Sequence, residues 1–201
     1  MHIGILGSGA VGQALAHGLT RHGHEIRIGT RKDAVEGFAV GDPADVVDGA
    51  DLVFLSVVGT AAVEVAAGVR QQLRGKVLVD TTNPLEFSSG RPGLFVGHTD
   101  SLGEQVQRAV PEAHVVKAYN TVGNTLMVDP QLPGGPPSMF IGGDSDEAKA
   151  EVTALLGETG WDVIDLGGIE ASRCLEPMCI AWVLHGARTG TWEHAFRLLR
   201  R

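Results

Sequence analysis

The sequence has little of several features that define whole classes of protein. Its 201 residues include two cysteines, one tyrosine and only 5% aromatic side chains, and the formal net charge is −8. Because it lacks a basic surplus and any lysine- or arginine-rich run, we expect no surface for nucleic acid or for an anionic membrane. No apolar run approaches the length of a membrane span, and the chain enters its first predicted strand without a charged leader. We therefore expect a cytoplasmic location.

Residues that bind metals are few or unsuitably spaced. Cys174 and Cys179 lie in a segment with helical periodicity, at a spacing typical of neither a disulfide framework nor a zinc site. We interpret them as reduced thiols of a core or an interface. The eight histidines lack a ligand spacing such as HExxH. His98 falls in a loop near the expected crevice, but a surface or packing role is more common for such a residue. The sequence predicts no metal centre.

What the sequence does contain is a regular alternation of strand and helix signals. Near-continuous apolar strands separated by helices are typical of a doubly wound, mostly parallel Rossmann-type α/β sheet with both faces covered. After the first two strands, further strands are predicted at residues 52–57, 76–80, 114–119, 138–142 and 162–166, and helices at residues 44–51, 61–73, 101–110 and 144–156.

The N-terminus carries the most specific motif. The apolar run His2–Leu6 is followed by Gly7-Ser8-Gly9-Ala10-Val11-Gly12 and then by a helical pattern. In a dinucleotide-binding turn the first glycine permits a tight bend, the second lets the backbone approach the pyrophosphate, and the third lets the helix pack on the sheet. The pyrophosphate would then lie at the helix N-terminus, where free N–H groups and the helix dipole favour an anion.

The end of the second strand predicts which dinucleotide is bound. NAD sites usually place a carboxylate there for the ribose 2′-hydroxyl, whereas this chain has Thr30, Arg31 and Lys32. Hydroxyl and cationic groups bind a 2′-phosphate through charge-assisted hydrogen bonds, so NADP is the expected cofactor. Asp33 lies one position too late for the carboxylate role and is a candidate start of the next helix. The alternative is that Arg31 and Lys32 are solvated loop charges.

Further candidates follow the later strands, because ligands of such sheets bind at the carboxyl ends of the strands. A ligand role is one interpretation of Asn83, Pro84 and Lys117. The alternative is that Asn83 and Pro84 only start a turn and that Lys117 is only a charge at a strand end. No acid–base pair stands out, so we predict no catalytic side chain. The candidate cofactor-pocket residues at these ends are Ser56, Val57, Val58, Asn83, Pro84, Asn120 and Thr121.

Several segments in the same order resemble the F420-dependent NADP oxidoreductase family over nearly the whole chain. They are Gly29-Thr30-Arg31, Asp80-Thr81-Thr82-Asn83-Pro84-Leu85, Val116-Lys117-Ala118-Tyr119-Asn120-Thr121, Met139-Phe140-Ile141-Gly142-Gly143-Asp144, and Gly167-Gly168-Ile169-Glu170 with Leu175-Glu176-Pro177. The resemblance implies hydride transfer between NADP and the deazaflavin F420, by stacked rings, in a homodimeric or higher enzyme.

One departure leaves the acceptor open. Archaeal members of that family have His where this chain has Asn120, and Asn there also occurs in flavin-using relatives such as the cytosolic domains of membrane metalloreductases. F420, FMN and FAD therefore all remain candidate acceptors. Two other functions also stay open: an NADP(H)-binding sensor without turnover, because a fold alone does not establish chemistry, and a reductase of a small organic substrate such as an imine.

The length bounds the domain organisation. Residues 1–166 are predicted to form the NADP-binding domain and residues 167–201 a helical appendage that contacts a dimer partner and the acceptor pocket. The appendage has more apolar side chains than one small domain is expected to cover. The predicted intersubunit side chains are Ile169, Leu175, Met178, Ile180, Trp182, Val183 and Leu184.

Overall fold

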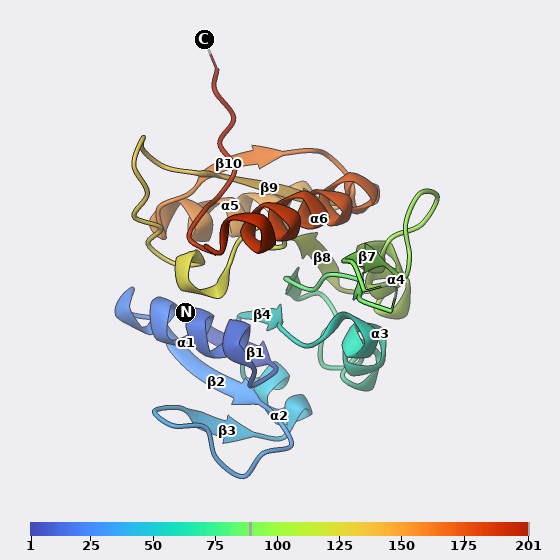
Figure 1. Cartoon of the computed structure of the whole chain (residues 1–201). Helices are drawn as coiled ribbons and strands as arrows, with labels where there is room; N and C mark the ends of the chain where they lie inside the picture. The colour runs from blue at the N-terminus through green and yellow to red at the C-terminus, as the bar shows by residue number, and fades with distance from the viewer. Residues whose placement is uncertain (89, 201) are drawn as a thin grey trace.

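Short apolar runs build the centre of the sheet. The computed structural model describes residues 1–88 and 90–200, and its main sheet has eight strands in the order β10-β9-β8-β5-β4-β1-β2-β3 (Figure 1). All neighbouring pairs are parallel except β8 and β9, which are antiparallel. The predicted doubly wound, mostly parallel α/β fold is confirmed. The strands are β1 (His2–Leu6), β2 (Glu25–Gly29), β3 (Ala39–Gly41), β4 (Leu52–Leu55), β5 (Val77–Asp80), β8 (His114–Lys117), β9 (Ser138–Gly143) and β10 (Asp162–Asp165).

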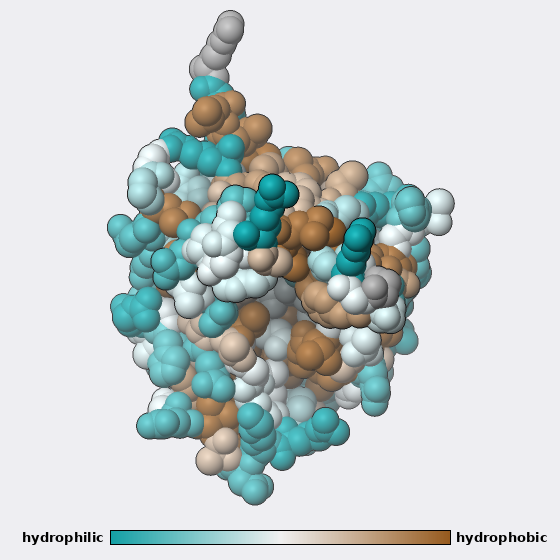
Figure 2. All heavy atoms as spheres, in the orientation of Figure 1, coloured by the Kyte–Doolittle hydropathy of each residue, from teal (hydrophilic) through white to brown (hydrophobic). Residues whose placement is uncertain are grey.

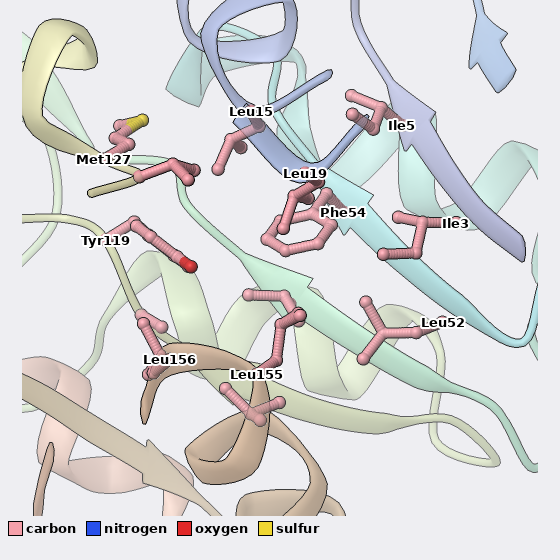
Figure 3. Close-up of a cluster of buried hydrophobic side chains, with 14 of the residues drawn as sticks. Ile3, Ile5, Leu15, Leu19, Leu52, Phe54, Tyr119, Met127, Leu155 and Leu156 are labelled. Carbon is pink, nitrogen blue, oxygen red and sulfur yellow. The ribbon is translucent and has the colours of Figure 1, made fainter. Parts of the chain in front are cut away.

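Helices cover both faces of this sheet. Alternating side chains of a strand point to opposite faces, and Ile5 and Leu6 of β1 accordingly belong to two separate apolar clusters. Figure 3 shows the first cluster, where Leu15 and Leu19 of α1 pack with Phe54 of β4. The helices are α1 (Ala10–Arg21), α2 (Pro43–Asp48), α3 (Gly59–Gly68), α4 (Leu102–Ala109), α5 (Asp146–Glu158) and α6 (Ser172–Thr189), with short 3₁₀ turns η1 (Asn124–Leu126) and η2 (Ile169–Ala171).

The order of the strands fixes where a ligand can bind. From β1 the chain moves one way to β2 and β3, then returns to β4 on the other side and continues outward. The neighbours β1 and β4 thus form the topological switch point, and a crevice is expected beyond their carboxyl ends. Those ends lead into the glycine turn and into the loop that starts α3.

Two local predictions were wrong, and one short hairpin was not predicted. No helix begins at Asp33; the chain bends there, forms a single bridge between Val35 and Phe38, and continues into the edge strand β3. The loop after β5 contains a small hairpin of β6 (Leu85–Glu86) and β7 (Gly93–Leu94). The helix predicted to reach residue 73 ends at Gly68, in keeping with the low helix propensity of glycine, and continues only as turns.

The tail is more closely integrated than predicted. Ile169, Leu175 and Trp182 are buried within this same chain, so their assignment to an intersubunit surface was wrong. The segment after α6 folds back, and Trp192 and His194 pack on Trp182 with ring centroids 5.4 and 4.7 Å away. Leu184 is exposed, and Met178, Ile180 and Val183 are half-buried. Among the described residues, no helix is long and apolar enough to cross a membrane.

Candidate functional site

The glycine turn between β1 and α1 is shaped by three different requirements. Gly7 has a φ of 121°, which favours glycine, and a Cβ there would overlap the carbonyl oxygen of Ser56. A Cβ on Gly12 would overlap the carbonyl oxygen of Gly7, so this glycine allows the helix to approach the turn. Gly9 differs, because no atom lies within 4 Å of the position of its Cβ. The backbone at Gly9 therefore faces open space.

The open space at Gly9 lies at the start of a helix. Gly9 is the N-cap residue of α1 and has no side chain to accept the first N–H groups of that helix. Those groups and the helix dipole suit an anion such as a pyrophosphate. The side-chain amide of Gln13 donates to the carbonyl oxygen of Ser8 at 2.9 Å and helps to fix the turn.

The residues predicted to select NADP lie beside this turn. The Oγ atoms of Ser8 and Thr30 are 3.0 Å apart, and the N–H of Lys32 donates to the Thr30 hydroxyl at 3.2 Å. Arg31 follows on the exposed loop. Two hydroxyls and a guanidinium thus gather at the end of β2, a set of donors suited to a phosphate.

A cleft of about 1010 Å³ lies at the switch point, and Figure 2 shows a hollow on this face of the molecule. Several residues not predicted as site residues also line it, among them Thr81, Thr82 and Phe87. Of the predicted site residues, eleven line the cleft: Gly7, Ser8, Gly9, Ala10, Val11, Thr30, Arg31, Ser56, Val57, Val58 and Asn83. Gly12, Lys32, Pro84, Asn120 and Thr121 lie outside its lining.

Behind the strand ends is a fully buried ionic cluster. Lys117, at the end of β8, places its Nζ 2.9 Å from Asp80 of β5 and 2.9 Å from Glu176 of α6. Burial by itself would lower the pKa of Lys117, but the charges of Asp80 and Glu176 raise it above its usual value. Lys117 is therefore a cation inside the protein, and it has no exposed atoms with which to contact a ligand.

Both carboxylates of this cluster have additional donors. The N–H and hydroxyl of Thr82 donate to Asp80 at 2.9 and 2.7 Å. Glu176 accepts the N–H groups of Leu102 and Gly103 at 3.0 and 2.9 Å, so it binds the N-terminus of α4, where a negative charge is favoured. The cluster joins β5, β8, α4 and α6 directly behind the cleft.

Asn120 is a structural link rather than a lining residue. Its Nδ2 donates to the carbonyl oxygen of Leu175 in α6 at 2.6 Å, and its own carbonyl oxygen accepts from Nδ2 of Asn83 at 2.9 Å. The preceding Tyr119 has a φ of 59°, an uncommon conformation for a bulky residue. Of these two asparagines, Asn83 lines the cleft and Asn120 does not. Helix α6 is therefore linked to the cleft indirectly, through the hydrogen bonds of Asn120.

Other parts of the described chain offer no competing centre. Across residues 1–88 and 90–200, no group of three His, Cys, Asp or Glu side chains is placed to hold a metal ion. A second hollow of about 460 Å³ lies at the amino ends of β1 and β2, near His2 and Glu25, and contains none of the predicted site residues. Cys179 is buried, which raises the pKa of its thiol to about 11, and Cys174 is exposed.

The doubly wound sheet, the glycine turn at a helix N-terminus and the cleft at the switch point define a Rossmann-type dinucleotide-binding protein. Comparison with known proteins narrows this class. A model of the family "NADP oxidoreductase coenzyme F420-dependent" matches residues 2–84. A crystal structure from Arthrobacter sp. FB24, provisionally described as an F420-dependent NADP reductase, is similar over 100% of both chains, with 41% identity and a TM-score of 0.93. The chain therefore belongs to this family of NADP-dependent oxidoreductases.

Two curated relatives show the breadth of the group. The F420-dependent NADP reductase of Methanocaldococcus jannaschii is 29% identical over 88% of this chain and 88% of its own length. The metalloreductase STEAP3 of Rattus norvegicus is 28% identical over 87% of this chain but over only 35% of its own length. The chain thus spans about a third of that metalloreductase, and this unit is shared by relatives whose names give different electron acceptors.

Proposed function

We propose that this protein transfers a hydride between NADP(H) and a deazaflavin, F420, or a flavin such as FMN or FAD. The observation that carries the proposal is the continuity of the cleft, which runs from the glycine turn and Arg31 past Ser56 to Asn83 and Phe87. One wall therefore offers anion-binding groups and the other offers strand ends where a second ring can meet the nicotinamide. The names of the similar proteins support F420 as the first acceptor to test.

In this proposal the residues of the chain bind and orient and do not themselves react. The N-terminus of α1 at Gly9 would hold the pyrophosphate, and Thr30 and Arg31 would hold the 2′-phosphate. When bound, NADPH would supply the hydride, and the acceptor ring would take up this hydride together with one proton from solvent. Positioning two rings at reactive distance is itself a large contribution to rate, since it removes the entropy cost of their encounter.

Ser56, Thr81 and Asn83 are proposed to hold the nicotinamide end. All three line the cleft at the carboxyl ends of β4 and β5. Thr81 donates to the carbonyl oxygen of Leu55 at 3.0 Å and to the Ser56 hydroxyl at 3.3 Å, so these two side chains are held in place. Asn83 is held by the carbonyl oxygen of Asn120. Side chains fixed in this way orient a ligand at little entropic cost.

The test is anaerobic mixing of NADPH with F420, FMN and FAD in separate reactions, followed by absorbance of both partners. We expect NADPH oxidation matched by acceptor reduction in at least one mixture, and none with the Gly9→Val protein. NADPH that binds tightly but is not oxidised by any acceptor would overturn the proposal in favour of a sensor. Oxidation by an imine alone would favour a reductase of small organic substrates.

Assembly as a homodimer is part of the proposal. Its support is the exposed Leu184, with half-buried Met178, Ile180 and Val183 along α6, because apolar surface of this kind is more often found at an interface. Light scattering at micromolar concentration should give twice the monomer mass, and a monomer mass would reject it. The cytoplasmic location expected from the sequence stays a prediction.

A further inference from the structure

The arrangement of the cleft gives a bound dinucleotide a direction. Gly9 and the N-terminus of α1 mark the pyrophosphate, and Thr30 and Arg31 at the end of β2 mark the adenosine phosphate. The nicotinamide must then extend the opposite way, over the carboxyl ends of β4 and β5. An acceptor ring that stacks on it would lie further along, where the chain continues from Asn83 into the β6–β7 hairpin.

Apolar side chains that line this end of the cleft are unusually exposed. Phe87, which follows β6, is 60% exposed, and Val58, in the loop after β4, is 71% exposed. Both line the cleft, although they come from different elements. A single exposed apolar residue is ordinary, but an aromatic ring that lines a ligand cleft offers a flat apolar face to a ligand.

The backbone beneath Phe87 is held in place. Leu85 pairs with Leu94 across the hairpin, and the N–H of Phe95 donates to the carbonyl oxygen of Pro84 at 2.9 Å. The carbonyl oxygen of Phe87 itself accepts the N–H of Gly90 at 3.0 Å, which closes the turn. The ring is thus presented from a fixed backbone position.

We propose that Phe87 is the residue on which the planar ring of the hydride acceptor stacks. The inference rests on the proposed function, since it takes the acceptor to be a flat tricyclic deazaflavin or flavin. An aromatic side chain stacks on such a ring through its face, with ring centroids a few ångströms apart, and excludes water from the pair. Phe87 then governs the affinity for the acceptor and leaves NADP binding to the glycine turn and to Arg31.

The test compares three variants in direct binding and in turnover. Phe87→Ala removes the ring, Phe87→Tyr keeps it, and Phe95→Ala removes a ring of the same hairpin region that is 41% exposed and lies outside the cleft lining. Binding of F420 and of FMN to the protein saturated with NADP⁺ is measured by fluorescence titration, which needs no turnover. NADPH affinity and the KM and kcat of the acceptor reaction are measured in parallel.

We expect Phe87→Ala to weaken acceptor binding and raise acceptor KM about tenfold, as loss of one aromatic stacking partner does. Phe87→Tyr and Phe95→Ala should stay within about twofold of the unchanged protein, and NADPH affinity should not change. Unchanged acceptor binding in Phe87→Ala, an equal effect of Phe95→Ala, or no acceptor binding by the unchanged protein would overturn the inference. A weakened NADPH affinity would instead place the ring against the cofactor and also overturn it. Acceptor binding that depends on Phe87 without any turnover would uphold the inference while the proposed function fails.

Discussion

The two sides of the cleft are built in different ways. On the glycine side, β1, the turn and α1 form the cradle from residues that are close in sequence, and its shape depends on backbone atoms. On the strand-end side, Asp80, Lys117 and Glu176 come from three distant segments and meet as buried charges. The first side depends on the space that glycines leave open, and the second depends on charges that must all be present. Substitutions should therefore separate binding from stability.

The largest effect is expected for Lys117→Met. It removes the cation between Asp80 and Glu176 and leaves two buried carboxylates without a counter-charge, which typically costs about 3–5 kcal/mol of the free energy of unfolding. Urea unfolding at neutral pH measures this loss in the free energy of unfolding. The matched control is Arg74→Met, which breaks an exposed ion pair of 2.6 Å with Glu112 and should cost at most about 1 kcal/mol. Equal losses in the two variants would show that the buried cluster has no special role.

Gly9→Val should weaken cofactor binding and leave the stability of the fold nearly unchanged. Because no protein atom lies within 4 Å of a Cβ at Gly9, the fold should tolerate the larger side chain, while a bound pyrophosphate would not. We expect NADPH affinity to fall by at least about 100-fold, which is roughly 2.7 kcal/mol, with little change in the urea midpoint. Gly157→Val in α5, which is equally uncrowded but outside the cleft, is the control. Unchanged NADPH affinity in Gly9→Val would place the cofactor elsewhere.

The two sides also differ in how much of them the sequence predicts. The glycine motif specifies its own turn, so β1, α1 and the role of each glycine follow from local spacing, and the structure has the expected turn. The apolar runs of β4 and β5 predict buried strands equally well. In contrast, β3 is a three-residue edge strand and β6–β7 has two residues per strand, too short for any periodicity. In such short segments, tertiary contacts determine the conformation more than the intrinsic β propensity of the residues does.

Residues far apart in the sequence explain the remaining misses. The sequence marks Lys117 as a strand-end charge but does not reveal that Glu176 will meet it, because that contact needs α6 in place. Leu175 and Trp182 indicate an apolar helix face, but the sequence does not indicate what covers that face. In the structure, other residues of the same chain bury both side chains. Asn120 follows a strand end as a ligand residue would, yet its amide is bound to Leu175. Phe87 carried no signal, since a single Phe in a polar loop has no pattern.

On the glycine side, the choice of cofactor should rest on Arg31. We expect NADPH to bind at least about tenfold more tightly than NADH, because Thr30 and Arg31 would contribute roughly 1.5–3 kcal/mol through charge-assisted hydrogen bonds to the 2′-phosphate. Arg31→Asp should erase or reverse the preference by placing a carboxylate beside that phosphate. Fluorescence titration with both cofactors measures this preference, with Arg74→Asp, outside the cleft, as a charge-matched control. Equal affinities in the unchanged protein would contradict the NADP assignment.

The smallest effect is expected for an exposed ion pair on the strand-end side, which separates buried from exposed charge. Hydrogen bonding to Arg108 at 2.8 Å lowers the pKa of Asp100 to about 2 from its usual 3.8. The folded pKa lies below the unfolded value, so the pair stabilises the protein fully above about pH 4, and this contribution is lost as the pH falls from about 4 towards 2. Because both side chains are partly exposed, we expect less than about 1 kcal/mol. Urea midpoints of the unchanged protein and of Asp100→Asn should differ slightly at about pH 6 and converge as the pH approaches about 2, and Arg108→Met should behave in the same way. A difference that stays constant down to about pH 2 would mean that Asp100 acts through packing and not through its charge.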